Sequence, residues 1–127
     1  MTANTSRSKK QKGTRLEQKV AGEIRHRLKI NAQRMPLSGA ISHFRGDIYA
    51  PQFPFVIECK NQEKVKIWEW WKQARSQAGL RKPMLVFSGN HRPILAVVRL
   101  EDILDLQAEV NDLYNERKKD IPRFGER

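Results

Sequence analysis

The chain has 127 residues, and its 25 Lys and Arg against 14 Asp and Glu give a formal net charge of +11. This length suits one domain with a small core, and the charge indicates a polyanionic partner, with nucleic acid ahead of a membrane surface. No segment approaches the run of about 18 apolar residues that a membrane span needs, and no hydrophobic signal core follows the basic start. A single cysteine excludes an internal disulfide and fits a reducing cytoplasm.

The N-terminal third predicts a loose arm followed by a helix. Residues 1–12 are polar and basic and contain nothing to bury, so we expect a disordered arm. From Thr14 to about residue 30 an amphipathic helix is predicted, because apolar residues recur every four positions after a plausible cap at Gly13 and Thr14. Those positions are Leu16, Val20, Ile24 and Leu28. Glu17 lies at the margin of the apolar face, as a surface residue paired with Arg15 or Lys19 or as a functional carboxylate.

The middle and end of the chain alternate strands and helices. A strand or hairpin leg is expected at 41–44 after a turn at 37–40, then strands at 46–50, 54–60, 83–87 and 94–98. Helices are expected at 67–80 and from Leu100 to Leu113, the first with Trp68, Trp71, Ala74 and Ala78 on one side. The order predicts an α/β domain over residues 13–116 with a central mixed sheet flanked by helices, and a flexible basic tail at 117–127.

The most informative feature is a pair of carboxylates in the least polar part of the chain. Asp47 ends a glycine turn before an apolar run, and a second apolar run leads directly into Glu58-Cys59-Lys60. Side chains alternate along a strand, so Glu58 and Lys60 face one way while Ile57 and Cys59 face the other. Glu-x-Lys also occurs at 17–19 and 116–118, but only the copy at 58–60 follows a bulky apolar run.

Charges at the end of a buried strand are costly unless something compensates them. A divalent cation would do so, because carboxylate oxygens suit Mg²⁺ or Mn²⁺, and a neighbouring Lys can orient a water or offset charge on a phosphate. The alternative is that both carboxylates are structural charges of an edge strand.

Residues 12–108 resemble the PD-(D/E)XK nuclease superfamily and, within it, the Holliday junction resolvases of archaea and phages. Four segments carry the likeness: Lys12-Gly13 leading to Glu17, Arg34 with Leu37-Ser38-Gly39, Gly46-Asp47-Ile48-Tyr49-Ala50, and Ile57-Glu58-Cys59-Lys60. The resemblance implies a restriction-endonuclease-like fold. Gly46 stands where the family name has Pro, which leaves the Asp intact.

The resemblance also implies roles for individual residues. Glu17, Asp47, Glu58 and the backbone carbonyl of Cys59 would hold the metal, Lys60 would assist the attacking water, and Ser38 would be an accessory residue, with Ser42 as its alternative. Gln73 follows one element later, where several such nucleases carry a Gln that supports the active site, and it is a further candidate DNA contact, although a single helical Gln is usually a surface residue. Further contacts to DNA are expected from Lys9, Lys10, Lys12, Arg15 and Arg34.

The resulting hypothesis is a Mg²⁺-dependent endonuclease that cuts branched DNA as a homodimer, most simply a Holliday junction resolvase in a bacterial or archaeal cell or its phage. Two symmetric cuts in a four-way junction need two active sites related by a two-fold axis. Two alternatives remain: a nicking or restriction-like nuclease of other specificity, and a basic DNA-binding module whose carboxylates are structural.

Overall fold

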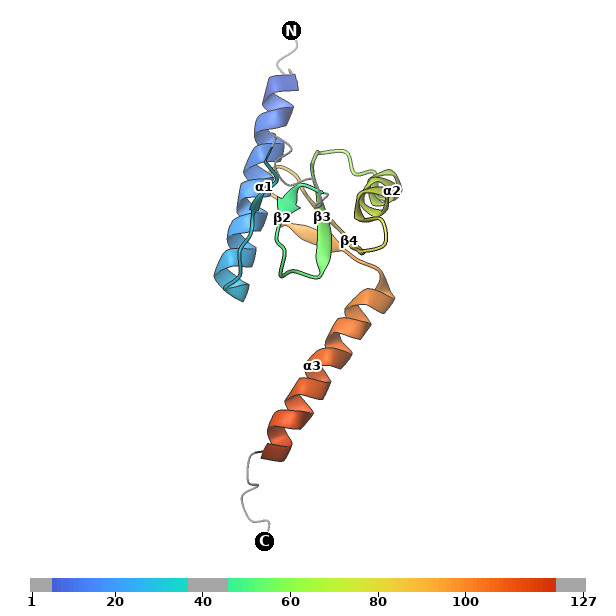
Figure 1. The fold of residues 1–127 in the computed structure, drawn as a ribbon. Coiled ribbons are helices and arrows are strands. Elements are labelled where there is room, and N and C mark those ends of the chain that lie inside the picture. Colours follow the sequence, from blue (N-terminus) through green and yellow to red (C-terminus); the bar gives the residue numbers. More distant parts are fainter. Residues whose placement is uncertain (1–5, 37–45, 121–127) are drawn as a thin grey trace. The chain divides into compact units, whose positions relative to one another are not determined.

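The computed structural model describes residues 6–36 and 46–120 of the chain. The chain divides between Val97 and Val98 into two compact units. The first unit contains helices α1 (Ser6–Leu28) and α2 (Ile67–Ala78) and every strand of the described ranges, and the second contains helix α3 (Leu100–Asp120) (Figure 1). The predicted α/β class is confirmed. The last helix, which the sequence placed in the same domain, forms a unit of its own.

The strands of the first unit form one short ladder and one mixed sheet. The ladder pairs β1 (Gln33–Arg34) antiparallel with β2 (Ile48–Tyr49). The mixed sheet has β4 (Lys82–Ser88) at its centre, parallel to β3 (Phe55–Asn61) and antiparallel to β5 (Leu95–Val97). A parallel pair needs a long crossover, and α2 supplies it between β3 and β4. The strand expected at 41–44 lies outside the described residues.

Helix α1 packs along one side of the sheet and forms the larger core cluster with it (Figure 1). Its apolar positions behave as predicted for three of four residues, since Leu16, Val20 and Ile24 are buried while Leu28 is half exposed. Ala21 adds to the same face. From the strands the cluster takes Ile48, Ile57 and Val86, and it includes Ala50 just after β2. The periodicity that predicted the helix therefore reports its buried face directly.

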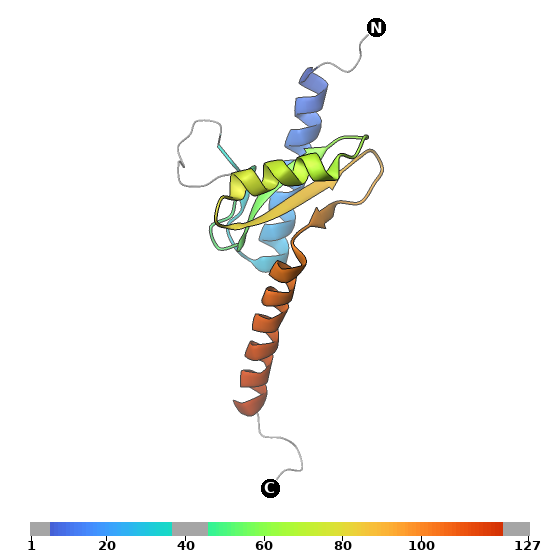
Figure 2. The ribbon, with the colours of Figure 1, turned by 90° about the vertical axis from the view of Figure 1, so that its right-hand side faces the viewer.

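Helix α2 covers another part of the sheet, and Figure 2 shows it lying across β4. Its buried residues are Trp70, Ala74 and Ala78, and Trp70 packs with Leu85. The predicted face was right for Ala74 and Ala78, which are buried, and wrong for Trp68, which is 82% exposed. Trp70, four residues before Ala74, is buried in its place, and the sequence alone did not distinguish the two tryptophans.

Both terminal helices extend further than the sequence predicted. Residues 6–12, expected to be disordered, are helical, so Gly13 and Thr14 lie inside α1 instead of capping it. Lys, Arg and Gln have high helix propensity, and extending an existing helix is far cheaper than starting one. Residues 117–120 of the expected tail likewise belong to α3. Within the described ranges no helix is long and apolar enough to cross a membrane.

Gly46 brings the segment before β2 directly against β3. Its φ of +89° lies in the left-handed region that glycine tolerates, and a Cβ there would stand 2.6 Å from the carbonyl oxygen of Ile57 and 2.9 Å from Cγ1 of Val56. Backbone bonds continue the contact, since Asp47 donates its N–H to the Ile57 oxygen at 2.8 Å and accepts from the Met35 N–H at 2.9 Å. A proline ring or any side chain at position 46 would force these strands apart.

We predict that Gly46→Ala lowers the free energy of unfolding by about 2 kcal/mol or more. An alanine here would have a strained left-handed backbone, and its Cβ would clash with the backbone of β3. Urea unfolding followed by circular dichroism measures this. Gly13→Ala is the matched control: nothing lies within 4 Å of the Cβ it would add, so it should stabilise α1 slightly. Equal stability of the two variants would contradict the close approach at Gly46.

Candidate active site

The predicted carboxylates come from three elements of the first unit. Glu17 lies on α1, Asp47 immediately precedes β2, and Glu58 and Lys60 lie on β3. All four side chains are neither fully buried nor fully exposed. The fold thus brings residues of distant segments to one region, where they remain accessible to a ligand.

Asp47 is held in place by the backbone of β3. Its Oδ2 accepts a 2.7 Å hydrogen bond from the N–H of Cys59, while its own N–H is bonded to Ile57 two residues earlier on the strand. One oxygen of the carboxylate is therefore fixed by the strand that carries Glu58. A side chain oriented in this way loses little further freedom when it binds a ligand.

Glu58 and Lys60 share one face of β3, as the alternation predicted. Ile57 and Cys59 pack into the cluster under α1, so the two charged residues point the other way. Nζ of Lys60 lies 3.9 Å from Oε1 of Glu58, and their side chains are only 20% and 14% exposed. The ammonium offsets part of the charge that Glu58 places on the sheet.

Arg34 contacts the third carboxylate, an interaction that the sequence did not reveal. Its Nε lies 3.5 Å from Oε2 of Glu17, and its Nη2 lies 3.4 Å from the hydroxyl of Thr14. Nε itself is buried and has no hydrogen-bond partner among the described residues. Arg34, expected as a DNA contact, thus also pairs with a proposed metal ligand and retains unused donor capacity beside the site.

The electrostatics of the three carboxylates are unfavourable in the absence of a ligand. Burial, reinforced by the negative charge of Asp47, raises the pKa of Glu17, and Arg34 opposes the rise. Burial also raises the pKa of Asp47, against the stabilising Cys59 N–H. Burial and the charge of Asp47 raise the pKa of Glu58 to about 7, with Lys60 opposing. Raised values at several neighbouring acids are typical of functional sites.

The carboxylates of Glu17, Asp47 and Glu58 are suitable ligands for a hard divalent cation, but they do not form a complete coordination site by themselves. Within the described ranges, no group of three Asp, Glu, His or Cys side chains converges closely enough to coordinate an ion. Mg²⁺ is commonly held by one or two carboxylates together with waters and substrate phosphates, so two carboxylates such as Asp47 and Glu58 would be enough for such an ion. Burial raises the pKa of the Cys59 thiol, and its side chain packs against the core cluster under α1, on the other face of β3 from Glu58.

The remaining predicted residues lie as follows. Ser38 and its alternative Ser42 fall outside the described residues. Gln73 is exposed on α2.

The basic residues expected to contact DNA lie on α1. They are Lys9, Lys10, Lys12 and Arg15, of which Lys10 and Arg15 are exposed and Lys12 is half-buried. Asn61, which sequence reasoning missed, donates Nδ2 to the carbonyl of Lys12 at 3.3 Å. Its only signal was its place directly after Lys60.

The comparison with protein families gives one match. A family model described as "Phage putative PDDEXK endonuclease" matches residues 8–121, which include every carboxylate of the candidate site. Comparisons with curated proteins and with solved structures gave no match. The family match agrees with the superfamily resemblance of the sequence and leaves open the metal and the shape of the DNA substrate.

We predict that Glu58 makes the stability of the metal-free protein fall with pH. Its folded-state pKa of about 7 lies above the ordinary value of 4.5, so the folded protein binds this proton more tightly than the unfolded chain. Stability is therefore greatest below about pH 4.5 for this group and declines until about pH 7. Glu58→Gln should remove on the order of 1 kcal/mol of that decline, after allowance for solvent screening.

Urea unfolding in chelator at a series of pH values measures the decline. Glu23→Gln serves as control, because Glu23 is an exposed residue of α1 whose pKa is lowered by Arg27. It should keep the wild-type decline. If Glu58→Gln and wild type lost stability in parallel across this range, Glu58 would not be the titrating group.

Proposed function

Because the chain belongs to the family of phage PD-(D/E)XK endonucleases, we propose that it hydrolyses DNA with a divalent metal and acts on branched substrates, foremost four-way junctions. The observation that carries the proposal is Asp47, fixed by the backbone of β3 beside Glu58 in a region where both carboxylates have raised pKa values. Buried carboxylates that repel one another destabilise the protein, and a bound cation would reverse that cost.

Each residue of the site has a distinct proposed task. Asp47 and Glu58 would hold Mg²⁺ or Mn²⁺, with Glu17 and the carbonyl oxygen of Cys59 as further ligands. The metal would supply positive charge to stabilise the phosphorane-like transition state. Lys60, on the same face of β3 as Glu58, would orient the attacking water and balance charge at the phosphate. Arg34 would keep Glu17 ionised and present its free donors to the DNA.

The overall charge supports DNA as the substrate. A net charge of +11 on 127 residues favours the phosphate backbone irrespective of sequence. Such binding suits an enzyme that recognises the shape of its DNA and has little need of base contacts. We expect it to act in the cytoplasm of the host cell. A nuclease without branch selectivity is the second candidate, because the matching family is described by its endonuclease activity alone.

A homodimer forms part of the proposal, and α3 offers a better surface for it than α2. Trp70 is buried in its own unit and Trp71 packs against the same cluster, which leaves Trp68 as the exposed tryptophan of α2. Helix α3 exposes six large apolar side chains, namely Leu100, Ile103, Leu104, Val110, Leu113 and Tyr114. A row of this kind on one helix is typical of a surface that binds another protein.

Charge along α3 favours its antiparallel pairing with a second copy. The part of the helix before residue 113 carries Glu101, Asp102, Asp105, Glu109 and Asp112 and no cation, while its end carries Arg117, Lys118 and Lys119 beside Glu116 and Asp120. Antiparallel pairing of two copies places each acidic part opposite a basic end, whereas parallel pairing would align like charges. It is also two-fold symmetric, as cuts in two strands of a junction require.

Cleavage assays test the catalytic proposal. Asp47→Asn and Glu58→Gln should each reduce Mg²⁺-dependent cleavage of a four-way junction by about a thousandfold or more, because each removes an anionic ligand. The Asn oxygen can still accept the Cys59 N–H, so folding and DNA binding in chelator should persist. Glu23→Gln should cut at the wild-type rate. Cleavage by both site variants near that rate would eliminate the metal site, and equal cutting of junction and duplex would favour the nuclease without branch selectivity.

Mixing experiments test the dimer. Sedimentation at micromolar concentration should give about twice 14.9 kDa. Val110→Asp should give monomers, because it places a charge in the exposed apolar row, whereas Val110→Ile should not. Heterodimers of wild type and Asp47→Asn should nick one strand and fail to release paired duplexes. A monomeric wild type that makes both cuts would contradict the dimer.

A further inference from the structure

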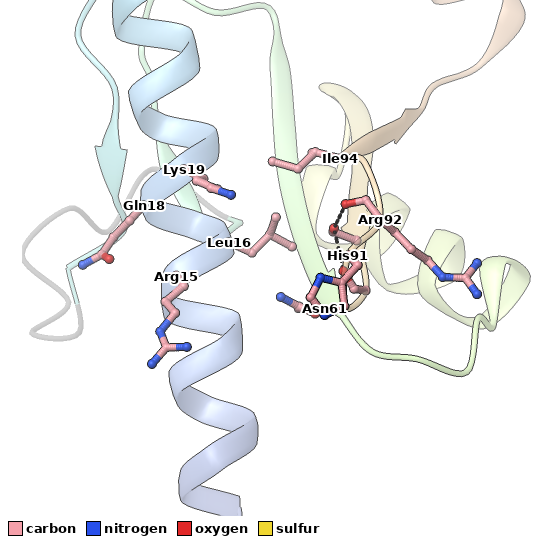
Figure 3. A pocket seen from close by; sticks show the side chains of 10 residues that line it. Arg15, Leu16, Gln18, Lys19, Asn61, His91, Arg92 and Ile94 are labelled. Carbon is pink, nitrogen blue, oxygen red and sulfur yellow. Dashed lines mark hydrogen bonds between the residues drawn. The ribbon is translucent and has the colours of Figure 1, made fainter.

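A cavity of about 690 Å³ lies beside the candidate site, between α1 and the loop that joins β4 to β5 (Figure 3). Helix α1 contributes Arg15, Leu16 and Lys19, β3 contributes Asn61 at its last position, and the loop contributes His91 and Arg92. We refer to this cavity as the basic groove. It is formed by three segments far apart in the sequence, so no single motif marks it.

The charge of the basic groove selects an anionic ligand. Arg15, Lys19 and Arg92 line it together with His91, and no Asp or Glu is among its lining residues. Within the described ranges, none of the three cations has a carboxylate partner within salt-bridge distance. Other exposed cations of the first unit, such as Lys29, Lys72 and Arg75, also have no carboxylate of the described residues within salt-bridge distance. The groove differs in that three such cations surround one hollow, which favours a ligand that brings the negative charge.

The groove is held in shape by hydrogen bonds on both sides. Asn61 donates Nδ2 to the carbonyl of Lys12, which ties the end of β3 to α1. On the opposite side, the hydroxyl of Ser88 donates to the carbonyl of Arg92 at 3.1 Å and lies 3.4 Å from the carbonyl of Gly89. The Asn90 N–H donates to a carboxylate oxygen of Glu63 at 2.6 Å. Leu16, only 3% exposed, lies at its base. The loop thus presents Arg92 from a fixed turn.

The placement of the cations suits an extended chain more than a small enclosed molecule. Figure 3 shows Lys19 reaching from α1 toward the sheet, while Arg15 and Arg92 extend outward on opposite sides of the hollow. All three residues are exposed. Charges spread across an open hollow can contact successive phosphates of one strand, and a free nucleotide would meet only some of them.

The groove and the candidate site are carried by the same stretches of α1 and β3. Leu16 precedes Glu17 on α1, and Asn61 follows Lys60 on β3. Leu16 and Asn61 line the groove, and Asn61 faces α1 while Lys60 faces the other side of the strand. We propose that the basic groove binds the phosphodiester backbone of DNA within a few nucleotides of the cut. This inference rests on the proposed function.

The test uses two triple variants that remove the same charge. Arg15→Gln, Lys19→Gln and Arg92→Gln together change the groove, and Lys29→Gln, Lys72→Gln and Arg75→Gln change exposed cations outside it. Fluorescence anisotropy of a labelled four-way junction, in chelator and over a range of salt, gives Kd and its salt dependence. We expect the groove variant to bind about tenfold or more weakly and its log-log salt slope to shrink by about 2 to 3, with a clearly smaller change in the control variant.

A second measurement locates the contact on the DNA. Single methylphosphonates, which remove the charge of one phosphate, are placed along the cleaved strand. At one or a few positions near the cut they should raise the Kd of wild type several-fold and that of the groove variant hardly at all. Equal weakening in the two triple variants would overturn the groove, as would an unchanged Kd or a methylphosphonate penalty that persists in the groove variant.

The outcomes for the groove and for catalysis are separable. Binding in chelator requires no cleavage, so a wild type that cuts no DNA but shows the expected pattern of Kd would refute the nuclease and leave the groove as a DNA-binding site. Active cleavage with identical Kd in wild type and groove variant would refute the groove alone. Inorganic phosphate at millimolar concentration should compete only weakly, since one anion engages part of the groove. Complete displacement by phosphate would identify a small-anion site and overturn the proposal.

Discussion

The contact between Gly46 and β3 is the constraint on which the site depends. Without a Cβ at position 46, the backbone approaches Ile57 closely enough for Asp47 to form two hydrogen bonds with β3, one from its N–H and one to its carboxylate. Those bonds tie Asp47 to Ile57 and Cys59, the residues on either side of Glu58. The family motif names a proline before the aspartate, and the same packing shows why a glycine can replace it here: the turn needs a left-handed residue that occupies little space.

That constraint has an electrostatic cost. It places a half-buried carboxylate next to a second one, and the mutual repulsion, added to burial, leaves Glu58 with a pKa of about 7. Lys60 and Arg34 each lie near one of the carboxylates and reduce the repulsion only in part. Keeping these charges together makes the folded protein less stable. Such a loss is expected at a binding site, where the free energy of ligand binding offsets it.

Local patterns predicted the parts of the fold that local physics determines. The four-residue spacing of Leu16, Val20 and Ile24 reports a helix face, and the alternation of Ile57 and Glu58 reports a strand with one apolar side, because both periods follow from backbone geometry. On α2 the sequence placed Ala74 and Ala78 correctly but chose Trp68 in place of Trp70, since only packing against Leu85 selects between the two tryptophans. The two-residue strand β1 was missed because its ladder exists only through pairing with β2.

The candidate catalytic residues and the cations of the basic groove differ in how clearly the sequence marks them. The candidate catalytic residues could be predicted because they interrupt apolar runs, where a charge is costly and therefore conspicuous in the sequence. The cations of the basic groove sit at exposed positions, where a charge costs nothing, so among 25 Lys and Arg they carry no signal of their own. Composition predicts that such a protein binds DNA, and only the fold decides which cations meet at one hollow. If the proposed roles hold, the exposed cations act through the free energy of binding and the half-buried carboxylates on the chemical step, so substitutions in the two sets should separate Kd from the rate of cleavage.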